Sequence, residues 1–303
     1  LCAVGYHTSA RPAELLAAGY DVAVVGEGER ALAQLVERVA SGDRPRGEIL
    51  GPLPISDLDD LPVSDFSLLD RYRPVADQVA PQLTLYLSRG CPYDCAFCME
   101  RAKRETSWRP YSVRRAIAEL ESLDRVFPIA GRTVYFADAL FGMKAAWRRE
   151  FLHALIDSGL RAEKFWMLMR VDSVGDGDLE LLARAGCGVG FGLESGDPEQ
   201  LRRIRKAGRF SDYLDTMRQI ARASAELDLP WGANVIVGHP GETEESLRAS
   251  HAYLSELFAA DQPHPGFLSV DPFRLYPGSP IDDDRASWSR EPGRRFQRPS
   301  WWH

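Results

Sequence analysis

The sequence predicts an α/β fold: a partial (β/α)6 barrel over residues 83–285 that follows the end of a smaller α/β unit. Two observations predict it. Between residues 83 and 281, six short runs of apolar, β-branched or aromatic residues alternate with segments whose apolar residues repeat with the helical period. Residues 1–45 show a shorter version of the same alternation. Strands that alternate with helices form parallel sheets, and six such repeats fit a partial barrel.

Composition and charge narrow the class of protein. The 303-residue chain has 45% hydrophobic and 27% charged residues, as ordinary globular proteins do. Its net charge of −7 gives no basic footprint, so we expect no nucleic-acid partner. We recognise no membrane-spanning apolar run and no signal peptide, and clustered free thiols suit a reducing cytoplasm. The chain begins with Leu1 inside an apolar run, so we expect a fragment of a longer protein.

Residues 1–45 predict two strand–helix repeats. The strands are expected at 1–4 and 21–25, with a short helix at 12–18 between them. A second helix follows the turn Gly26-Glu27-Gly28-Glu29, which lacks the full dinucleotide-binding pattern. Residues 46–82 are rich in proline and predict an extended linker, because proline disfavours helices.

Three of the five cysteines follow the first barrel strand, which we expect to be buried and to cover 84–88. Cys91, Cys95 and Cys98 lie within eight residues, on a loop at the carboxyl edge of the sheet, where α/β folds bind ligands. A [4Fe–4S] cluster normally takes four cysteines and a structural zinc takes four ligands. Three thiolates would leave one position open for a substrate or cofactor. The alternatives are a zinc site completed by a distant His, or chance clustering.

The other barrel elements follow in order. Ser112 can cap the first helix, and Asp197 followed by Pro198 opens another. The further strands are expected at 133–137, 165–171, 188–193, 233–237 and 268–275. The further helices are expected at 145–157, 178–185, 213–227 and 243–258. Active-site residues of barrels gather at the carboxyl ends of the strands, so the residues that follow each strand are the candidates for a site.

The spacing of Cys91, Cys95, Phe97 and Cys98 resembles the C-x-x-x-C-x-aromatic-C signature of the radical S-adenosylmethionine (SAM) enzymes. The resemblance implies that the three thiolates hold a [4Fe–4S] cluster whose open iron chelates the amino and carboxylate groups of SAM. An electron from the cluster would then cleave SAM to a 5′-deoxyadenosyl radical. The resemblance also implies the partial barrel, a small-molecule substrate and a reductant such as flavodoxin or ferredoxin.

The first unit is similar to the last part of the Rossmann-like cobalamin-binding domain found in one large class of these enzymes. Gly5, His7 and Pro12 match a G-x-H-x-x-x-x-P stretch, and Gly26 to Glu29 match a G-E-G-E turn. The class resemblance implies cobalamin as a further cofactor and methyl transfer as the commonest reaction, with other radical chemistry left open. This chain does not contain the D-x-H-x-x-G segment that supplies a cobalt ligand in many members. We therefore expect His7 to be a loop histidine and cobalamin binding to be weak or absent.

The resemblance also assigns roles to residues after the second and third barrel strands. Asp138 would help to hold the amino group of SAM. Arg170, in an R-V-D pattern with Asp172, would clamp the SAM carboxylate with a bidentate hydrogen bond. The alternatives are an acid at a helix N-terminus for Asp138 and a surface ion pair for Arg170.

Glu194 gives the strongest supporting signal. A carboxylate directly after an apolar run has little structural reason to be there, because burying it unpaired is costly. With Ser195 it matches the G-x-E-S-G pattern of the family, in which the Glu contacts the ribose of SAM. Gly192 and Gly196 would let the backbone approach a ligand.

The last two barrel strands carry weaker signals. Val237 and Gly238 begin a stretch similar to the family's G-x-P-G-E, which would face the adenine of SAM, and we expect His239 there to be a solvated loop histidine. Tyr276 would line the adenine pocket or serve in packing. Cys187 is expected to be an inert buried thiol.

Residues 286–303 are basic and aromatic and are expected to form a tail. A second hypothesis for the whole chain is a non-catalytic module that uses its three cysteines to bind a metal or carry electrons.

Overall fold

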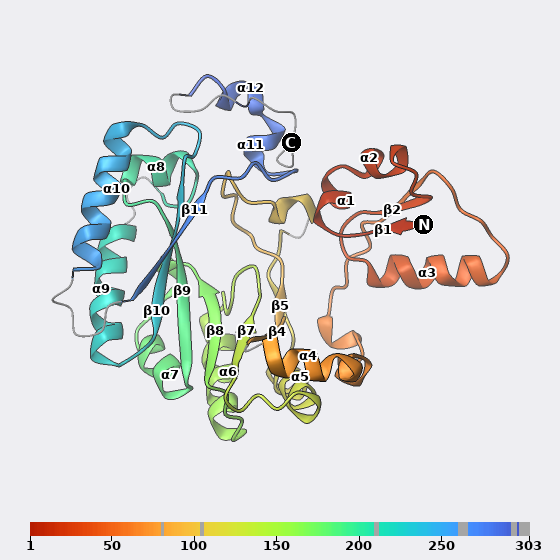
Figure 1. Ribbon diagram of the computed structural model, residues 1–303, viewed down its shortest axis with the longest axis horizontal. Coiled ribbons are helices and arrows are strands. Elements are labelled where there is room, and N and C mark those ends of the chain that lie inside the picture. Colours follow the sequence, from red (N-terminus) through yellow and green to blue (C-terminus); the bar gives the residue numbers. More distant parts are fainter. Residues whose placement is uncertain (80–81, 104–105, 209–211, 260–265, 292–295, 297–303) are drawn as a thin grey trace.

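The computed structural model describes residues 1–79, 82–103, 106–208, 212–259, 266–291 and 296. Its larger part is a six-stranded sheet surrounded by helices, and a three-stranded unit lies beside it (Figure 1). The prediction of an α/β fold with a parallel sheet is confirmed. Among the described residues, we find no helix that is both long enough and apolar enough to cross a membrane.

The six strands of the large sheet are all parallel and run in the order β11-β10-β9-β8-β7-β4. They are β4 (Gln82–Leu85), β7 (Thr133–Phe136), β8 (Lys164–Met169), β9 (Cys187–Glu194), β10 (Trp231–Val237) and β11 (Phe267–Pro272). Spatial order follows chain order, as expected for successive right-handed β–α–β units. Within the described strands, β4 and β11 form the two edges, which is the arrangement of a partial barrel.

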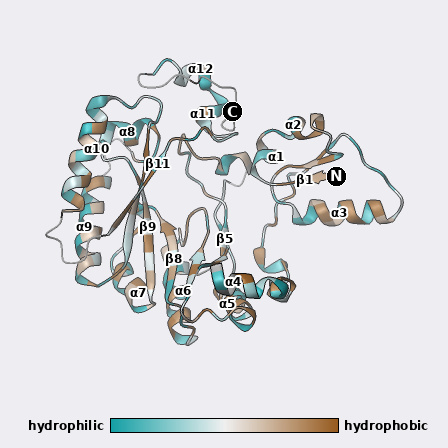
Figure 2. Ribbon diagram, viewed as in Figure 1, coloured by the Kyte–Doolittle hydropathy of each residue, from teal (hydrophilic) through white to brown (hydrophobic). Residues whose placement is uncertain are grey.

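Helices pack on the outer face of this sheet because alternate strand residues bury there. On β8, Phe165, Met167 and Met169 are buried in the core, whereas Trp166 and Leu168 face the inner side. The covering helices are α5 (Val113–Val126), α6 (Ala145–Asp157), α7 (Asp178–Arg184), α8 (Pro198–Arg203), α9 (Tyr213–Glu226) and α10 (Glu244–Leu257). Brown and teal bands alternate along the peripheral helices in Figure 2, as one apolar face per helix requires.

The first barrel strand differs from the prediction. It ends at Leu85 rather than continuing to Ser88, and two of its four residues, Gln82 and Thr84, are exposed on this edge strand of the sheet. The chain leaves the sheet because the Asp138 carboxylate accepts hydrogen bonds from the backbone N–H groups of Leu87 and Ser88. Ser88 then begins β5 (Ser88–Arg89), which pairs antiparallel with β6 (Arg109–Pro110).

The three-stranded unit contains β1 (Cys2–Ala3), β2 (Val22–Val24) and β3 (Glu48–Leu50), all parallel. Its helices are α1 (Tyr6–Ala10), α2 (Pro12–Ala17) and α3 (Glu29–Ala40). The prediction that His7 is a loop residue is wrong, because His7 lies in α1, where its Nε2 is 3.2 Å from Glu14 Oε2.

The range predicted as an extended linker, 46–82, contains regular secondary structure. It begins with β3 and contains the 3-10 helices η1 (Leu58–Asp60) and η2 (Phe66–Tyr72) and the helix α4 (Arg73–Val79). The prediction that proline keeps this range from forming a helix is wrong. Pro74 lies in the first turn of α4, where its missing N–H has no intrahelical partner to lose.

An ion pair joins the two units. Glu27, in the turn before α3, is 6% exposed and accepts hydrogen bonds from Arg109 of β6 and from the Ile55 backbone N–H. Arg109 also donates to the Ile55 carbonyl, and Arg89 lies 3.6 Å from Glu27. The turn that sequence analysis singled out therefore serves as a contact with the barrel.

The described chain continues past β11 through α11 (Pro280–Asp283) and α12 (Arg285–Trp288). Most of the predicted tail, 292–295 and 297–303, lies outside the described residues.

Candidate active site

The three signature cysteines lie on the loop between β5 and the 3-10 helix η3 (Glu100–Lys103). Cys95 is buried, and Cys91 and Cys98 are partly buried. Burial raises the pKa of Cys98 to about 12, and the thiols of Cys95 and Cys91 add to the rise. The three thiols thus lie on one short, partly buried loop.

The backbone of Ala96 fixes this loop in the centre of the molecule. Its N–H donates to the Ile204 carbonyl at 2.8 Å, and its carbonyl accepts from the Ile281 N–H at 3.0 Å. Ala96 is fully buried, between the turn after α8 and the start of α11. The Cys98 N–H donates to the Cys95 carbonyl at 3.1 Å, which makes the curled turn that sequence analysis expects.

The donor set fits a [4Fe–4S] cluster with one iron left open. Three thiols from one short loop match three of the four cysteines that such a cluster takes. Within the described ranges, no group of three His, Cys, Asp or Glu side chains converges on a position for a single metal ion. A [4Fe–4S] cluster does not require the three thiolates to converge on one position, because each thiolate binds a different iron.

Arg170 lies against this loop. Its guanidinium is 3.8 Å from the centroid of the Tyr93 ring, and its Nη1 is 3.8 Å from Cys95 Sγ. Asp172 accepts two hydrogen bonds from it, at 2.8 and 2.7 Å, and the Lys206 carbonyl accepts another at 2.6 Å. The structure therefore places Arg170 beside the cysteine loop, where its guanidinium is already paired with Asp172.

Glu194 ends β9 in a left-handed backbone conformation, with φ 69°. Its carboxylate accepts a hydrogen bond from Lys206 Nζ at 2.9 Å, and both side chains are more than nine-tenths buried. Sequence analysis missed Lys206, which stands in an Arg-rich segment that is typical of a solvated surface. The one signal that could have indicated Lys206 is its place shortly after helix α8, which itself follows the G-x-E-S-G stretch.

The two glycines beside Glu194 approach protein atoms. A Cβ on Gly192 would lie 2.6 Å from Lys206 Nζ and 2.7 Å from Glu194 Oε1. A Cβ on Gly196 would lie 2.9 Å from the backbone of Ser250 in α10. Gly192 thus makes room for the Glu194–Lys206 ion pair, and Gly196 makes room for a helix.

The side chains of Asp138 and Ser195 both accept hydrogen bonds from backbone N–H groups. One Asp138 oxygen accepts from Leu87 and Ser88, including the Ser88 hydroxyl at 2.7 Å, while its other oxygen has no hydrogen-bond partner among the described residues. Burial raises the pKa of Asp138 to about 7. The Ser195 hydroxyl is 3.0 Å from that of Ser250 and accepts from the backbone that follows it.

A cavity of about 470 Å³ opens at the carboxyl edge of the sheet. Its lining includes Phe97, Tyr135, Glu194, Asn234, Asp271 and Tyr276. Phe97 from the cysteine loop and Tyr276 after β11 therefore share a cavity with the end of β9. Gly238 has φ 81°, its N–H donates to the Glu242 carboxylate, and the Val237 carbonyl accepts from Phe273 at 2.7 Å.

The prediction that His239 is a solvated loop residue is wrong. Its side chain is fully buried, with ring centroids 5.5 Å from Phe97 and 5.3 Å from Phe273. The loop after β10 folds under the cysteine loop, so His239 becomes part of the wall behind Phe97. Cys187 is a buried thiol as predicted, and burial raises its pKa.

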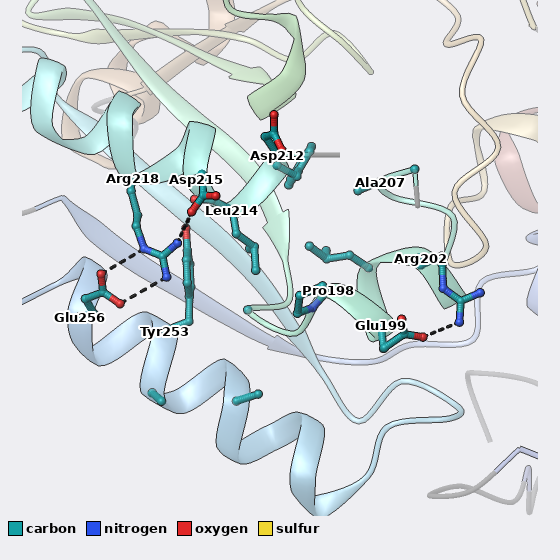
Figure 3. A pocket seen from close by; sticks show the side chains of 16 residues that line it. Pro198, Glu199, Arg202, Ala207, Asp212, Leu214, Asp215, Arg218, Tyr253 and Glu256 are labelled. Atoms are coloured by element: carbon teal, nitrogen blue, oxygen red, sulfur yellow. Dashed lines mark hydrogen bonds and ion pairs between the residues drawn. The ribbon is translucent and has the colours of Figure 1, made fainter. Parts of the chain in front are cut away.

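Two further cavities lie elsewhere in the molecule, one of them against the residues that flank the cysteine loop, Gly90 and Glu100. One of about 430 Å³ lies between the two units and is lined by residues that include Gly26 to Glu29, Tyr86 and Arg89. Another of about 530 Å³ lies among α8, α9 and α10 (Figure 3). There Arg218 pairs with Asp215 and Glu256, so the positive charge of Arg218 is balanced by carboxylates of the cavity wall.

Several known proteins are similar to this chain in sequence or in fold. The chain is 28% identical over 270 residues to the uncharacterised methyltransferase PH0819 of Pyrococcus horikoshii, a match that covers 81% of this chain and 56% of that protein. It is 26% identical over 189 residues to the tryptophan 2-C-methyltransferase of Streptomyces laurentii, covering 58% and 31%. The chain thus spans about half, or less, of the length of these curated relatives.

The fold is similar to a solved structure of the radical S-adenosylmethionine methyltransferase TsrM of Kitasatospora setae with cobalamin and a [4Fe–4S] cluster bound. The TM-score is 0.70 at 18% identity, over 94% of this chain and 58% of that one. Residues 85–254, more than half of the chain, match the sequence pattern of the Radical SAM superfamily. Together with a three-thiol loop whose donors fit an open [4Fe–4S] cluster, this match shows that the chain belongs to the Radical SAM superfamily.

Proposed function

We propose that this chain forms the cofactor-binding core of an enzyme that cleaves SAM reductively and uses the radical for methyl transfer to a small molecule. One observation carries the proposal: the three-thiol loop lies beside Arg170 and the buried Glu194–Lys206 ion pair, next to an open cavity at the carboxyl edge. When bound there, the cluster would supply the electron that cleaves SAM.

Each side chain at this edge has a distinct proposed task. Cys91, Cys95 and Cys98 would each bind one iron and leave the fourth for SAM. Glu194 would accept hydrogen bonds from the ribose hydroxyls. Arg170 would face the SAM carboxylate, since a guanidinium can pair with a second carboxylate beside Asp172.

Other predicted residues would complete the SAM site. Phe97, Tyr276 and the backbone at Val237 and Gly238 would border the adenine. Asp138 would support the amino-group side by holding the chain that enters the cysteine loop. Ser195 would act at one remove, because its hydroxyl fixes the turn after Glu194 to α10.

The finer parts of the proposal are supported by the relatives. Two similar proteins are named methyltransferases, and one of those names specifies tryptophan. We propose cobalamin as a second cofactor of the enzyme because a structure of the same fold binds it, and we expect this chain alone to bind cobalamin weakly because it does not contain the D-x-H-x-x-G segment. A flavodoxin or ferredoxin is the proposed electron donor, and tryptophan is the first substrate to test.

The test is anaerobic reconstitution with iron and sulfide, followed by incubation with SAM and dithionite. We expect the broad visible absorbance of a cluster and the formation of 5′-deoxyadenosine. Replacing Cys91, Cys95 or Cys98 by Ala should remove both signals, because each thiolate binds its own iron. Cys2→Ala and Cys187→Ala should keep both. Loss of the cluster in Cys187→Ala would contradict the three-ligand assignment, and a loaded protein that forms no 5′-deoxyadenosine would contradict the proposed function.

A further inference from the structure

The Glu194–Lys206 ion pair is buried beside the cavity that Glu194 shares with Phe97 of the cysteine loop. Lys206 Nζ lies 2.9 Å from Glu194 Oε1, and the two side chains are 8% and 9% exposed. The pair lies over the bare backbone of Gly192, where any Cβ would collide with both charged groups. Tyr213 donates to the Gly192 carbonyl at 2.6 Å and holds that backbone from another side.

The turn that carries Lys206 contacts the cysteine loop directly. The Ile204 carbonyl accepts the Ala96 N–H, and Arg205 donates to Asp94 at 2.7 Å. Arg205 has φ 58°, a left-handed conformation that non-glycine residues adopt rarely. This strained turn directs Lys206 inward, while Ile204 and Arg205 hold the cysteine loop.

Arg170 links the turn of Lys206 to the thiols. It donates a hydrogen bond to the Lys206 carbonyl at 2.6 Å, and its Nη1 lies 3.8 Å from Cys95 Sγ. Glu194, Lys206 and Arg170 are all buried beside the cysteine loop.

Buried charges act strongly because the surroundings screen them little. The reduction potential of an iron–sulfur cluster depends on nearby charge, on hydrogen bonds to its sulfurs and on solvent exposure. Reduction adds one electron, delivered by a flavodoxin- or ferredoxin-class donor, and so adds one negative charge. A nearby cation lowers the free energy of the reduced state.

We propose that the Glu194–Lys206 ion pair tunes the reduction potential of the cluster, with Lys206 favouring the reduced state and Glu194 opposing it. The inference rests on the proposed function, because it requires the cluster. Lys206 would be a positioning and electrostatic residue, since it acts through Glu194 and through space.

The test is an anaerobic redox titration of the reconstituted cluster, monitored by electron paramagnetic resonance, without SAM. We expect Lys206→Met to lower the midpoint potential by at least a tenfold change in the one-electron equilibrium, which is 59 mV. Glu194→Gln should raise the potential. The double variant Lys206→Met/Glu194→Gln should fall between the two single variants, and it has no unpaired buried charge that would oppose folding.

Two further variants separate charge from packing. Lys206→Arg keeps the charge and should stay near the wild-type potential. Arg202→Met removes an exposed cation of α8 and should leave the potential unchanged. Single variants at 194 and 206 that shift the potential in the same direction, or do not shift it, would overturn the inference. A wild-type protein that forms no cluster would overturn the proposed function instead.

Discussion

At the scale of single residues, Asp138 combines complete burial with a structural task. Three donors from Leu87 and Ser88 converge on one of its oxygens and lead the chain from β4 into the cysteine loop. The Ser88 hydroxyl also accepts a hydrogen bond from Trp108 at 3.0 Å. Burial favours the neutral acid, so the pKa of Asp138 rises from 3.8 to about 7.

This raised pKa predicts a pH dependence of stability. Between pH 4 and pH 7 the folded state binds more protons at Asp138 than the unfolded state does, so stability falls as pH rises. The loss amounts to roughly 4 kcal/mol at most, at about 1.4 kcal/mol per pKa unit. We expect Asp138→Asn to remove this slope in urea unfolding of the cluster-free protein. The exposed Asp176→Asn should keep it, and an unchanged slope in Asp138→Asn would contradict the assignment.

Glu194 predicts a graded loss of SAM affinity. Hydrogen bonds to a charged group contribute roughly 1.5–3 kcal/mol each, so Glu194→Ala should weaken SAM binding at least about tenfold. Glu194→Gln should be milder, because an amide oxygen still accepts a hydrogen bond. Glu194→Ala also leaves Lys206 buried without its partner and should lower thermal stability.

Isothermal titration of the reconstituted variants with SAM checks this prediction. Glu199→Ala is the control, because Glu199 is an exposed acid of α8 that pairs with Arg202 (Figure 3). Equal affinity in Glu194→Ala and Glu199→Ala would show that Glu194 does not contact the ribose.

The sequence predicted those site residues that stand in a recognisable local pattern with their neighbours along the chain. The cysteines and Glu194 stand in local patterns, so their positions at the carboxyl edge could be predicted. Lys206 and His239 could not, since a charged residue among arginines and a histidine between glycine and proline both indicate exposed loops. Contacts with distant segments bury them instead.

At the scale of elements, Gly196 determines how closely α10 packs. A Cβ at this position would lie 2.9 Å from both Ser250 Cα and Tyr253 Cβ, and the helix backbone cannot yield locally. We therefore expect Gly196→Ala to destabilise the protein by about 1–3 kcal/mol, as overpacking does. Gly208→Ala, with nothing within 4 Å, is the control in thermal unfolding. Equal melting temperatures for the two variants would contradict the close approach.

Most element positions followed from hydrophobic periodicity, because alternate residues pack against a continuous core. Two of the failures have specific causes. The apolar run 84–88 looked like one strand, but Asp138 withdraws Leu87 and Ser88 from the sheet. The proline-rich range looked extended, but Pro74 falls where a helix tolerates proline.

At the scale of the whole molecule, Glu27 and Arg109 hold the two units together. Burial acts to raise the pKa of Glu27, but hydrogen bonds from Arg109 and Ile55 outweigh it and lower the pKa. We expect either Glu27→Gln or Arg109→Met to destabilise the junction by several kcal/mol, because each variant removes the nearest opposite charge from a largely buried charged side chain.

Limited proteolysis within 46–82, with thermal unfolding alongside, measures the effect. The double variant Glu27→Gln/Arg109→Met should be closer to wild type than the sum of the single losses, since the two side chains are in direct contact. Strictly additive losses would show that the ion pair does not join the units.

The hydrogen bonds of Ala96 also constrain the order of events during biosynthesis. Both backbone partners of Ala96, Ile204 and Ile281, emerge from the ribosome long after the three thiols do. A nascent chain that ends before Ile281 therefore presents its cysteines on a loop whose final shape is not yet enforced. Iron and sulfide delivered then would meet an unformed site, so cluster insertion belongs after synthesis of the last barrel strand and of α11.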